Sequence, residues 1–270
     1  MSRKLFIPVL RELGFDAGFS LRNPIAFGYK AAKSVHVKIT LFRDSKIACT
    51  RFVEFQGDSA YLLSTENDWN LPSGSTLAGD FVTAEFVTDS HGPLPVEFGC
   101  EAQLIYQSAA GARASVLLDM VPVRGKGHKY APIFHNGHYM LSSEAFETYM
   151  CFTNFNVDQT ENSSAAGNEF EFRVLSHGGE TLSTYKRSLP YNATALLPVS
   201  EFAKETGNKP VTILARGGAS QFAIFSVFQN RSRHGIGIEH SLPPIYYTDA
   251  VKNPETRKIF YQKAFGNLWN

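Results

Sequence analysis

Two stretches of the chain, residues 169–202 and 35–69, show the same order of hydrophobic and polar positions. In the later stretch Phe170, Phe172 and Val174 alternate with polar residues, which is the period of a strand with one buried face. A Gly-Gly pair then breaks the pattern, and glycine adopts the positive φ that a tight turn requires. A second extended run, a proline-marked break and a third apolar run follow. The pattern therefore predicts a β-hairpin and a third strand.

The earlier stretch matches the later one in both spacing and order. Val35, Val37 and Ile39 lie 135 positions before their counterparts, and Leu62-Leu63 lies 134 positions before Leu196-Leu197. Further matches occur in the same order on both sides: Phe6–Val9 with Tyr130–Ile133, Phe19–Asn23 with Met150–Asn154, Leu104–Gln107 with Ser226–Gln229, and Pro122 with Pro244. Many matches in one order predict an internal duplication.

The spacing of the turn signals predicts the fold class. Short extended runs recur roughly every 8–12 residues, which is typical of an antiparallel β-sandwich. No strand pattern alternates with a long helical pattern, and this disfavours a parallel α/β sheet. We therefore predict an all-β fold with two tandem antiparallel β-sandwich domains, residues 1–125 and 126–246. Residues 247–270 form a tail in which Asn253-Pro254-Glu255 has the capping pattern that opens a short C-terminal helix.

The individual strands can be placed most closely in the first copy. We expect a lead-in, a strand over residues 18–25, a hairpin over 35–55, a third strand that ends at 63, a strand over 81–87, and a hairpin that pairs 98–107 with 112–120. The second copy repeats this order. Its loop after the third strand has room for one helical turn at residues 201–205.

Charge and hydropathy exclude several classes of partner. The chain carries 26 basic and 25 acidic residues, a net charge of +1, so no strong field favours nucleic acid or a membrane surface. No apolar run approaches the ~20 residues of a membrane-spanning helix. We expect no nucleic-acid binding and no membrane insertion.

Three cysteines, Cys49, Cys100 and Cys151, occupy unrelated positions in the two copies. An odd and unpatterned set indicates reduced thiols and not a disulfide framework. We therefore expect unpaired cysteines and a cytoplasmic location.

The segment Arg233–His240 predicts a strand with one bare face. Its isoleucines share the face that packs on the core, and its glycines share the other face with a glutamate. A face without side chains lets a ligand ring or another backbone approach closely. The candidate ligand-binding residues here are Gly235, Gly237, Glu239 and His240. In the alternative interpretation, the glycines relieve crowding against the tail and the histidines lie at the rim. The first copy carries Arg113, Ser115, Leu117 and Asp119 on the corresponding face, so we expect any such site to belong to the second copy alone.

A second candidate ligand site lies where the copies join. It comprises His128, His135 and His138. Two histidines separated by two residues reach one metal from a turn but point to opposite faces of a strand, and no cysteine or carboxylate completes a recognised ligand set. We therefore expect no metal and no cofactor. In the alternative interpretation these are linker histidines in an interdomain groove.

The order of features in the second copy resembles a known family. A strand that ends in Thr153-Asn154 leads to a Phe-x-Phe-x-Val strand, a proline-marked break precedes Leu196-Leu197, and a late strand ends in Gln229-Asn230-Arg231. This order resembles the small β-sandwich domains of the sensory rhodopsin transducer family over residues 147–241. The resemblance implies a soluble cytoplasmic sandwich that oligomerises and binds partners. This chain departs from that family because it carries two copies and a helical tail.

The sequence favours a binding or assembly module over an enzyme. It contains no Gly-x-Ser-x-Gly elbow, no cysteine in a catalytic setting and no His-Glu-x-x-His. We therefore predict a non-enzymatic module that binds a small polar ligand or a protein partner and forms a homo-oligomer. The alternative is an enzyme, with or without a metal ion, that acts on a carbohydrate or small polar metabolite in an interdomain groove.

Overall fold

The computed structural model describes residues 3–21, 35–55, 63–64, 79–87, 101–119, 121–122, 141–155, 167–176, 180–202, 209–217, 221–230 and 235–239. We call residues 3–122 the first half and residues 141–239 the second half. The first half contains β1 (Arg3–Pro8), the 3-10 turn η1 (Arg11–Leu13), β2 (Phe15–Leu21), β3 (Val35–Arg43), β4 (Lys46–Phe55), β5 (Leu63–Ser64), β6 (Phe81–Val87), β7 (Glu101–Ser108), β8 (Arg113–Asp119) and β9 (Val121–Pro122). The second half contains β10 (Phe146–Phe155), β11 (Gly167–Leu175), β12 (Thr181–Pro190), β13 (Ala193–Pro198), α1 (Val199–Phe202), β14 (Thr212–Gly217), β15 (Gln221–Asn230) and β16 (Gly235–Glu239).

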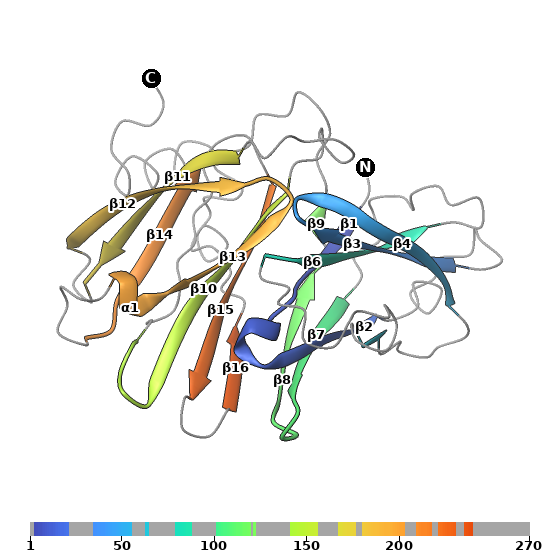
Figure 1. Ribbon diagram of the computed structural model, residues 1–270, viewed down its shortest axis with the longest axis horizontal. Coiled ribbons are helices and arrows are strands. Elements are labelled where there is room, and N and C mark those ends of the chain that lie inside the picture. Colours follow the sequence, from blue (N-terminus) through green and yellow to red (C-terminus); the bar gives the residue numbers. More distant parts are fainter. Residues whose placement is uncertain are drawn as a thin grey trace, which may run out of the picture.

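The described strands form four antiparallel sheets, which confirms the predicted all-β class (Figure 1). The first half has the strand orders β4-β3-β6-β1-β9 and β5-β2-β7-β8. The second half has the orders β12-β11-β14 and β13-β10-β15-β16. If β10–β16 are matched one by one with β2–β8, the order β12-β11-β14 repeats β4-β3-β6, and the order β13-β10-β15-β16 repeats β5-β2-β7-β8. In the first half, β1 and β9 extend the sheet that contains β4, β3 and β6.

Strand register agrees with the residue matches found in the sequence. Phe19 of β2 lies opposite Leu63 and Leu104, and its counterpart Met150 of β10 lies opposite Leu197 and Ser226. These are the same residues that the sequence comparison equates. An internal duplication predicts this agreement, and the common origin of the halves stays a prediction.

The hairpin over residues 35–55 is confirmed, and its turn follows from local backbone geometry. Asp44 and Ser45 connect β3 to β4 and both have positive φ, 49° and 65°. Two-residue turns of this kind match the right-handed twist of paired strands, and aspartate tolerates the left-handed region better than most residues. In the second half Asn192 also has positive φ, 53°, where the chain passes from β12 of one sheet to β13 of the other.

Each pair of sheets encloses a hydrophobic core. The second-half core comprises Met150, Phe152, Phe170, Phe172, Val174, Leu189, Leu197, Val199, Phe202, Val211, Ile213 and Ala215. The larger core fills the first half and includes residues from β1, β2, β3, β6 and β7. Burial of such aromatic and aliphatic side chains contributes roughly 1.5–3 kcal/mol each before the entropy of ordering is subtracted.

The strand β10 of the sheet β13-β10-β15-β16 is buried on both faces. Met150 and Phe152 of β10 point into the second-half core, whereas Cys151 and Phe155 belong to the first-half core together with Phe225. Figure 1 shows this sheet between β11 and β14 on one side and the first-half strands on the other. The two halves therefore share a core, an arrangement that the sequence pattern did not indicate.

Phe155 of β10 forms aromatic contacts with residues of the first half. Its ring meets Phe6 edge-on at 5.3 Å and Phe42 edge-on at 5.6 Å between centroids, and Phe42 stacks on Phe81 at 4.6 Å. Edge-to-face and offset pairs of this kind add about 0.5–1.5 kcal/mol beyond area burial.

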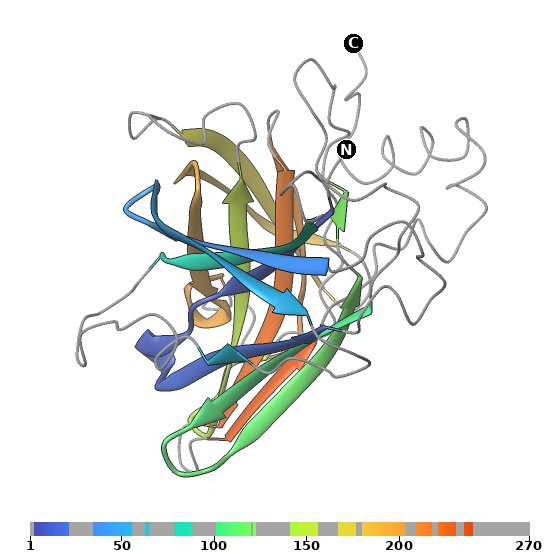
Figure 2. The same ribbon diagram turned by 90° about the vertical axis from the view of Figure 1, so that its right-hand side faces the viewer.

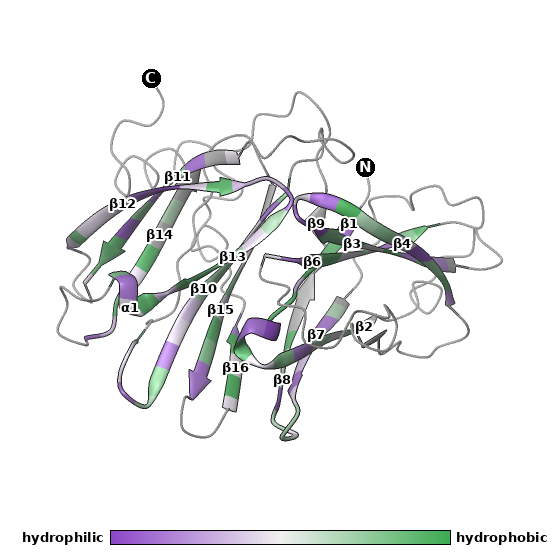
Figure 3. Ribbon diagram, viewed as in Figure 1, coloured by the Kyte–Doolittle hydropathy of each residue, from purple (hydrophilic) through white to green (hydrophobic). Residues whose placement is uncertain are grey.

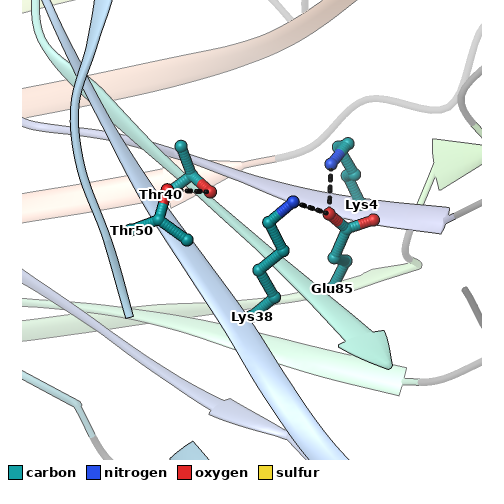
Figure 4. A network of polar contacts seen from close by, with 5 residues as sticks. All are labelled: Lys4, Lys38, Thr40, Thr50 and Glu85. Atoms are coloured by element: carbon teal, nitrogen blue, oxygen red, sulfur yellow. Dashed lines mark hydrogen bonds and ion pairs between the residues drawn. The ribbon is translucent and has the colours of Figure 1, made fainter. Parts of the chain in front are cut away.

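A polar network crosses the sheet β4-β3-β6-β1-β9 (Figure 4). Glu85 of β6 lies between two lysines on neighbouring strands, 2.6 Å from Lys4 Nζ and 3.7 Å from Lys38 Nζ. Thr40 and Thr50 form a hydroxyl pair at 3.4 Å on the adjoining strands. Burial lowers the pKa of Lys4 below its ordinary value of 10.5, and the nearby Glu85 carboxylate opposes that shift.

β4 and β12 are edge strands with exposed side chains, and the ladder that each forms with its neighbouring strand contains a register shift. Figure 3 shows hydrophilic and hydrophobic segments along both, and Phe52 of β4 is 44% exposed. The ladder shifts register between Leu41 and Phe42 in one half and between Val174 and Leu175 in the other. Bulges at sheet edges discourage pairing with a further chain. The homo-oligomer expected from the sequence stays a prediction.

Several boundaries differ from the sequence-based prediction. The lead-in forms a strand, β1, which pairs with β6 and β9. The predicted strand over 18–25 begins earlier, at Phe15, and the helical turn expected at 201–205 is α1 at Val199–Phe202. The predicted tail, 247–270, lies outside the described residues. Among the described residues, the protein contains no helix with the length and hydropathy needed to cross a bilayer.

Candidate functional site

The two halves meet at the ends of two sheets. β8 is the last strand of β5-β2-β7-β8, and β16 is the last strand of β13-β10-β15-β16. Figures 1 and 2 both show β8 and β16 side by side, and their Cα atoms approach within 8 Å. Among the described residues, hydrogen-bonded pairing stops at each of these two edges. The edges therefore form a seam between the halves.

An open groove of about 710 Å³ lies over this seam. Both halves contribute to its lining, which comprises Gln103, Ser115, Val116, Phe228, Gly237, Ile238 and Glu239. The volume falls within the roughly 300–1,000 Å³ typical of small-molecule sites. We call this feature the seam groove.

One flank of the seam groove is a polar pair from the first half. Gln103 of β7 and Ser115 of β8 lie diagonally on one sheet face, where side chains of neighbouring strands interact. Gln103 Nε2 donates a hydrogen bond to Ser115 Oγ at 3.0 Å. The serine hydroxyl can then donate its own hydrogen, and the amide Oε1 of Gln103 can accept one. The pair presents a donor and an acceptor side by side.

The floor of the seam groove is apolar and comes from the second half. Gly237 lies opposite Phe228 in the β15–β16 ladder, so both share one sheet face. A Cβ added at Gly237 would lie 3.6 Å from Phe228 Cβ and 3.7 Å from Cδ2, which is ordinary van der Waals contact. The glycine therefore leaves the space beside the aromatic ring open. Phe146 of β10 lies beside that ring on the same sheet face, with 6.1 Å between ring centroids.

The other flank carries a carboxylate. Glu239 ends β16 on the same face as Gly237, because side chains two residues apart on a strand share a face. Its side chain is half-buried. Among the described lining residues it is the only ionisable group.

The seam groove contains part of the site predicted from the sequence. Gly237 and Glu239 line it, and Ile236 and Ile238 pack on the first-half core as their alternation predicts. Gly235 belongs to β16 but lies against Asn230 and does not line the groove. The four predicted histidines lie outside the described residues: His128, His135, His138 and His240.

Sequence reasoning missed the first-half contribution. Gln103, Ser115 and Val116 line the seam groove, so the expectation of a site confined to the second copy does not hold for this groove. Their strands lie more than 100 residues from β16 in the chain, and no local sequence pattern indicates that the edge strands of two sheets lie side by side. The only available signal was the alternation that places Gln103 and Ser115 on the solvent side of their hairpin.

Other reactive groups lie away from the seam groove. Among the described residues no group of three or more His, Cys, Asp or Glu side chains could hold a metal ion. Cys49 and Cys151 are free thiols, as predicted, and Cys100 lies outside the described residues. Burial raises the pKa of Cys151 far above its ordinary value, which makes this thiol unreactive.

A comparison with models of known protein families, and with curated proteins, found no match for this chain.

Proposed function

We propose that the protein is a non-catalytic binding module whose ligand is a small polar molecule held in the seam groove. The observation that carries the proposal is the composition of the groove, an apolar floor between two polar flanks. Ligand sites typically combine an apolar surface with a few polar groups that fix orientation. The proposal needs both halves, because the Gln103–Ser115 pair and Glu239 come from different sheets.

The same lining argues against acid–base catalysis in the groove. A general acid–base reaction needs a proton donor and a proton acceptor within reach of the substrate. Among the described lining residues Glu239 is the only carboxylate, and no histidine, lysine or cysteine accompanies it. Gln103 and Ser115 serve better as fixed hydrogen-bonding partners than as catalysts, since the Ser115 hydroxyl is hydrogen-bonded to Gln103 and no described histidine or lysine lies in the groove to activate it.

The experiment is a ligand screen read at Gly237 itself. The protein, labelled with ¹⁵N-glycine, gives amide signals from its 21 glycines, and the Gly237 signal is the one lost in Gly237→Ala. Mixtures of small polar metabolites are then added. We expect at least one compound to shift the Gly237 signal while the signal of Gly167, at the start of the distant β11, stays in place.

Gly235→Ala is the matched control, since it adds the same methyl group to the same strand outside the groove. A compound that binds in the groove should keep its affinity for Gly235→Ala and lose it for Gly237→Ala. A screen in which no compound moves the Gly237 signal would overturn the proposed function.

A further inference from the structure

A row of aromatic rings ends at the seam groove. Phe146 of β10 and Phe228 of β15 lie on one face of their sheet, with 6.1 Å between ring centroids. The next strand, β16, contributes Gly237, which lies directly opposite Phe228 and has no side chain. Aromatic rings prefer centroid separations of about 4.5–7 Å, and neighbouring strands lie about 4.8 Å apart. A planar ring placed over Gly237 would therefore meet Phe228 at a preferred stacking distance and extend the row.

The polar pair across the seam is suited to the edge of such a ring. β8 lies beside β16, with Cα atoms within 8 Å, so a ring over Gly237 extends towards Ser115 and Gln103, which line the same groove. Gln103 donates one amide hydrogen to Ser115 Oγ, and its carboxamide has a second hydrogen and an acceptor oxygen. The hydrogen bond to Ser115 holds the carboxamide in place. The flank thus offers a donor and an acceptor close together.

Nitrogen heterocycles complement this arrangement of ring and carboxamide. Adenine, cytosine and nicotinamide each carry an amino or amide N–H donor beside an acceptor atom at the edge of a flat ring system. A glutamine or asparagine carboxamide can form two hydrogen bonds with such an edge, as it does with adenine in nucleic acids. The faces of these rings stack on aromatic side chains. One ligand can therefore use the aromatic floor and the polar flank at the same time.

Two other ligand shapes fit the groove less well. A pyranose ring carries hydroxyls around its whole rim, and those that face Val116, Ile238 or the Phe228 ring would lose water without gaining a hydrogen bond. An extended peptide that joined the two sheets as an extra strand would need about 9.6 Å between β8 and β16, twice the usual strand spacing. Their Cα atoms approach within 8 Å, so no strand fits between them.

We propose that the ligand of the seam groove is a planar nitrogen heterocycle, stacked on Phe228 over Gly237, whose edge presents a hydrogen-bond donor and acceptor to the Gln103 carboxamide. This inference rests on the proposed function and names its ligand class. Ser115 is a positioning residue, because its hydroxyl accepts the hydrogen bond that orients Gln103 Nε2. Gly237 admits the ring, because a methyl group there would occupy the space over the backbone beside Phe228.

The test is isothermal titration of the full chain with defined probes. The heterocycles are adenine, cytosine and nicotinamide, and the comparison probes are glucose and triglycine. We expect at least one heterocycle to bind. Its dimethylated form, in which both hydrogens of the amino or amide group are replaced, should bind at least threefold more weakly because it lacks the N–H donor. Adenosine and cytidine are titrated beside the free bases, and the tighter binder shows whether the ring is taken as a base or as a nucleoside; either result supports the proposal.

Four variants identify the contacts, and far-ultraviolet circular dichroism of each should match wild type. Gly237→Ala introduces only ordinary van der Waals contacts and should lower heterocycle affinity at least tenfold, whereas Gly235→Ala, outside the groove, should bind as wild type does. Gln103→Met keeps the length of the side chain without its carboxamide and should weaken binding roughly three- to tenfold. Phe228→Leu removes the stacking ring and should weaken binding about fivefold or more.

The outcomes separate this inference from the proposed function. A heterocycle that binds Gln103→Met as tightly as wild type, or whose dimethylated form binds equally well, would overturn the assigned edge contact and with it the inference. If glucose or triglycine binds with sensitivity to Gly237→Ala and no heterocycle does, the ligand class is wrong and the proposed function stands. If no probe and no screened metabolite responds to Gly237→Ala, both proposals fail.

Discussion

Replacing Glu85 with glutamine tests the electrostatic interpretation of the polar network in the first half. The Glu85 side chain is 7% exposed and that of Lys4 is 15% exposed, and their charged atoms lie 2.6 Å apart. Glutamine keeps the size of the side chain but removes the charge that stabilises the Lys4 ammonium. Removing one partner of a fully buried pair costs about 3–5 kcal/mol. Lys4 retains some access to solvent, so we expect Glu85→Gln to lower the free energy of unfolding by about 2–3 kcal/mol at pH 7.

The pH dependence identifies the cause of this loss. The pKa of Lys4 lies below its ordinary value of 10.5, with burial as the largest cause and Glu85 opposing it. Without Glu85 the pKa of Lys4 falls further, so above that pKa the unfolded chain binds more protons than the folded one. Stability of the variant then rises with pH until the unfolded lysine also loses its proton. The difference from wild type should shrink as pH rises from 7 towards 10.5.

Urea unfolding followed by far-ultraviolet circular dichroism measures both effects. Glu169→Gln is the matched control, because Glu169 forms a cross-strand pair with Lys186 at 3.1 Å but is 59% exposed. Exposed pairs of this kind contribute roughly 0–1 kcal/mol. Equal losses for the two variants, or a Glu85→Gln loss that stays constant from pH 7 to pH 10, would refute the role assigned to burial.

Three further predictions address the cores. Phe155→Ala removes the ring shared by both halves and should destabilise the chain by about 3–5 kcal/mol, whereas Phe52→Ala, on the exposed edge, should cost less than about 1 kcal/mol in the same urea titration. Tyr106→Phe removes the buried hydrogen bond from the tyrosine hydroxyl to the Pro8 carbonyl, 2.7 Å long, and should cost about 1–2 kcal/mol. Iodoacetamide labelling at pH 8 with peptide mapping should modify Cys49 and leave Cys151 unmodified until denaturant is added, because of these two described cysteines only Cys151 is fully buried; early labelling of Cys151 would contradict its position.

The sequence predicted strands best where one face is buried and the other is exposed to solvent. The β3–β4 hairpin was placed within a residue of its observed bounds because Val35, Val37 and Ile39 alternate with polar residues. β10 shows little alternation of hydrophobic and polar residues, because both of its faces are buried. β1 was missed because it is short, starts with Arg3-Lys4 and ends in Pro8, which together resemble a loop.

The candidate site was only half predictable for a related reason. Alternation alone placed Gly237 and Glu239 on a bare strand face, and that face does line a groove. The opposing flank depends on how two sheets meet, which is a packing relation between strands far apart in the chain. The repeat predicts that β8 and β16 hold equivalent places in their sheets, but it does not predict that these two edges touch.

A crystal structure of the full chain with a small polar molecule that binds tests the central claim most directly, because that claim requires one ligand to touch both halves. We predict a ligand that lies over Phe228 and Gly237, in contact with Glu239 on one side and within hydrogen-bonding distance of Gln103 or Ser115 on the other. A ligand found elsewhere on the surface, or one held by residues of a single half, would contradict the account.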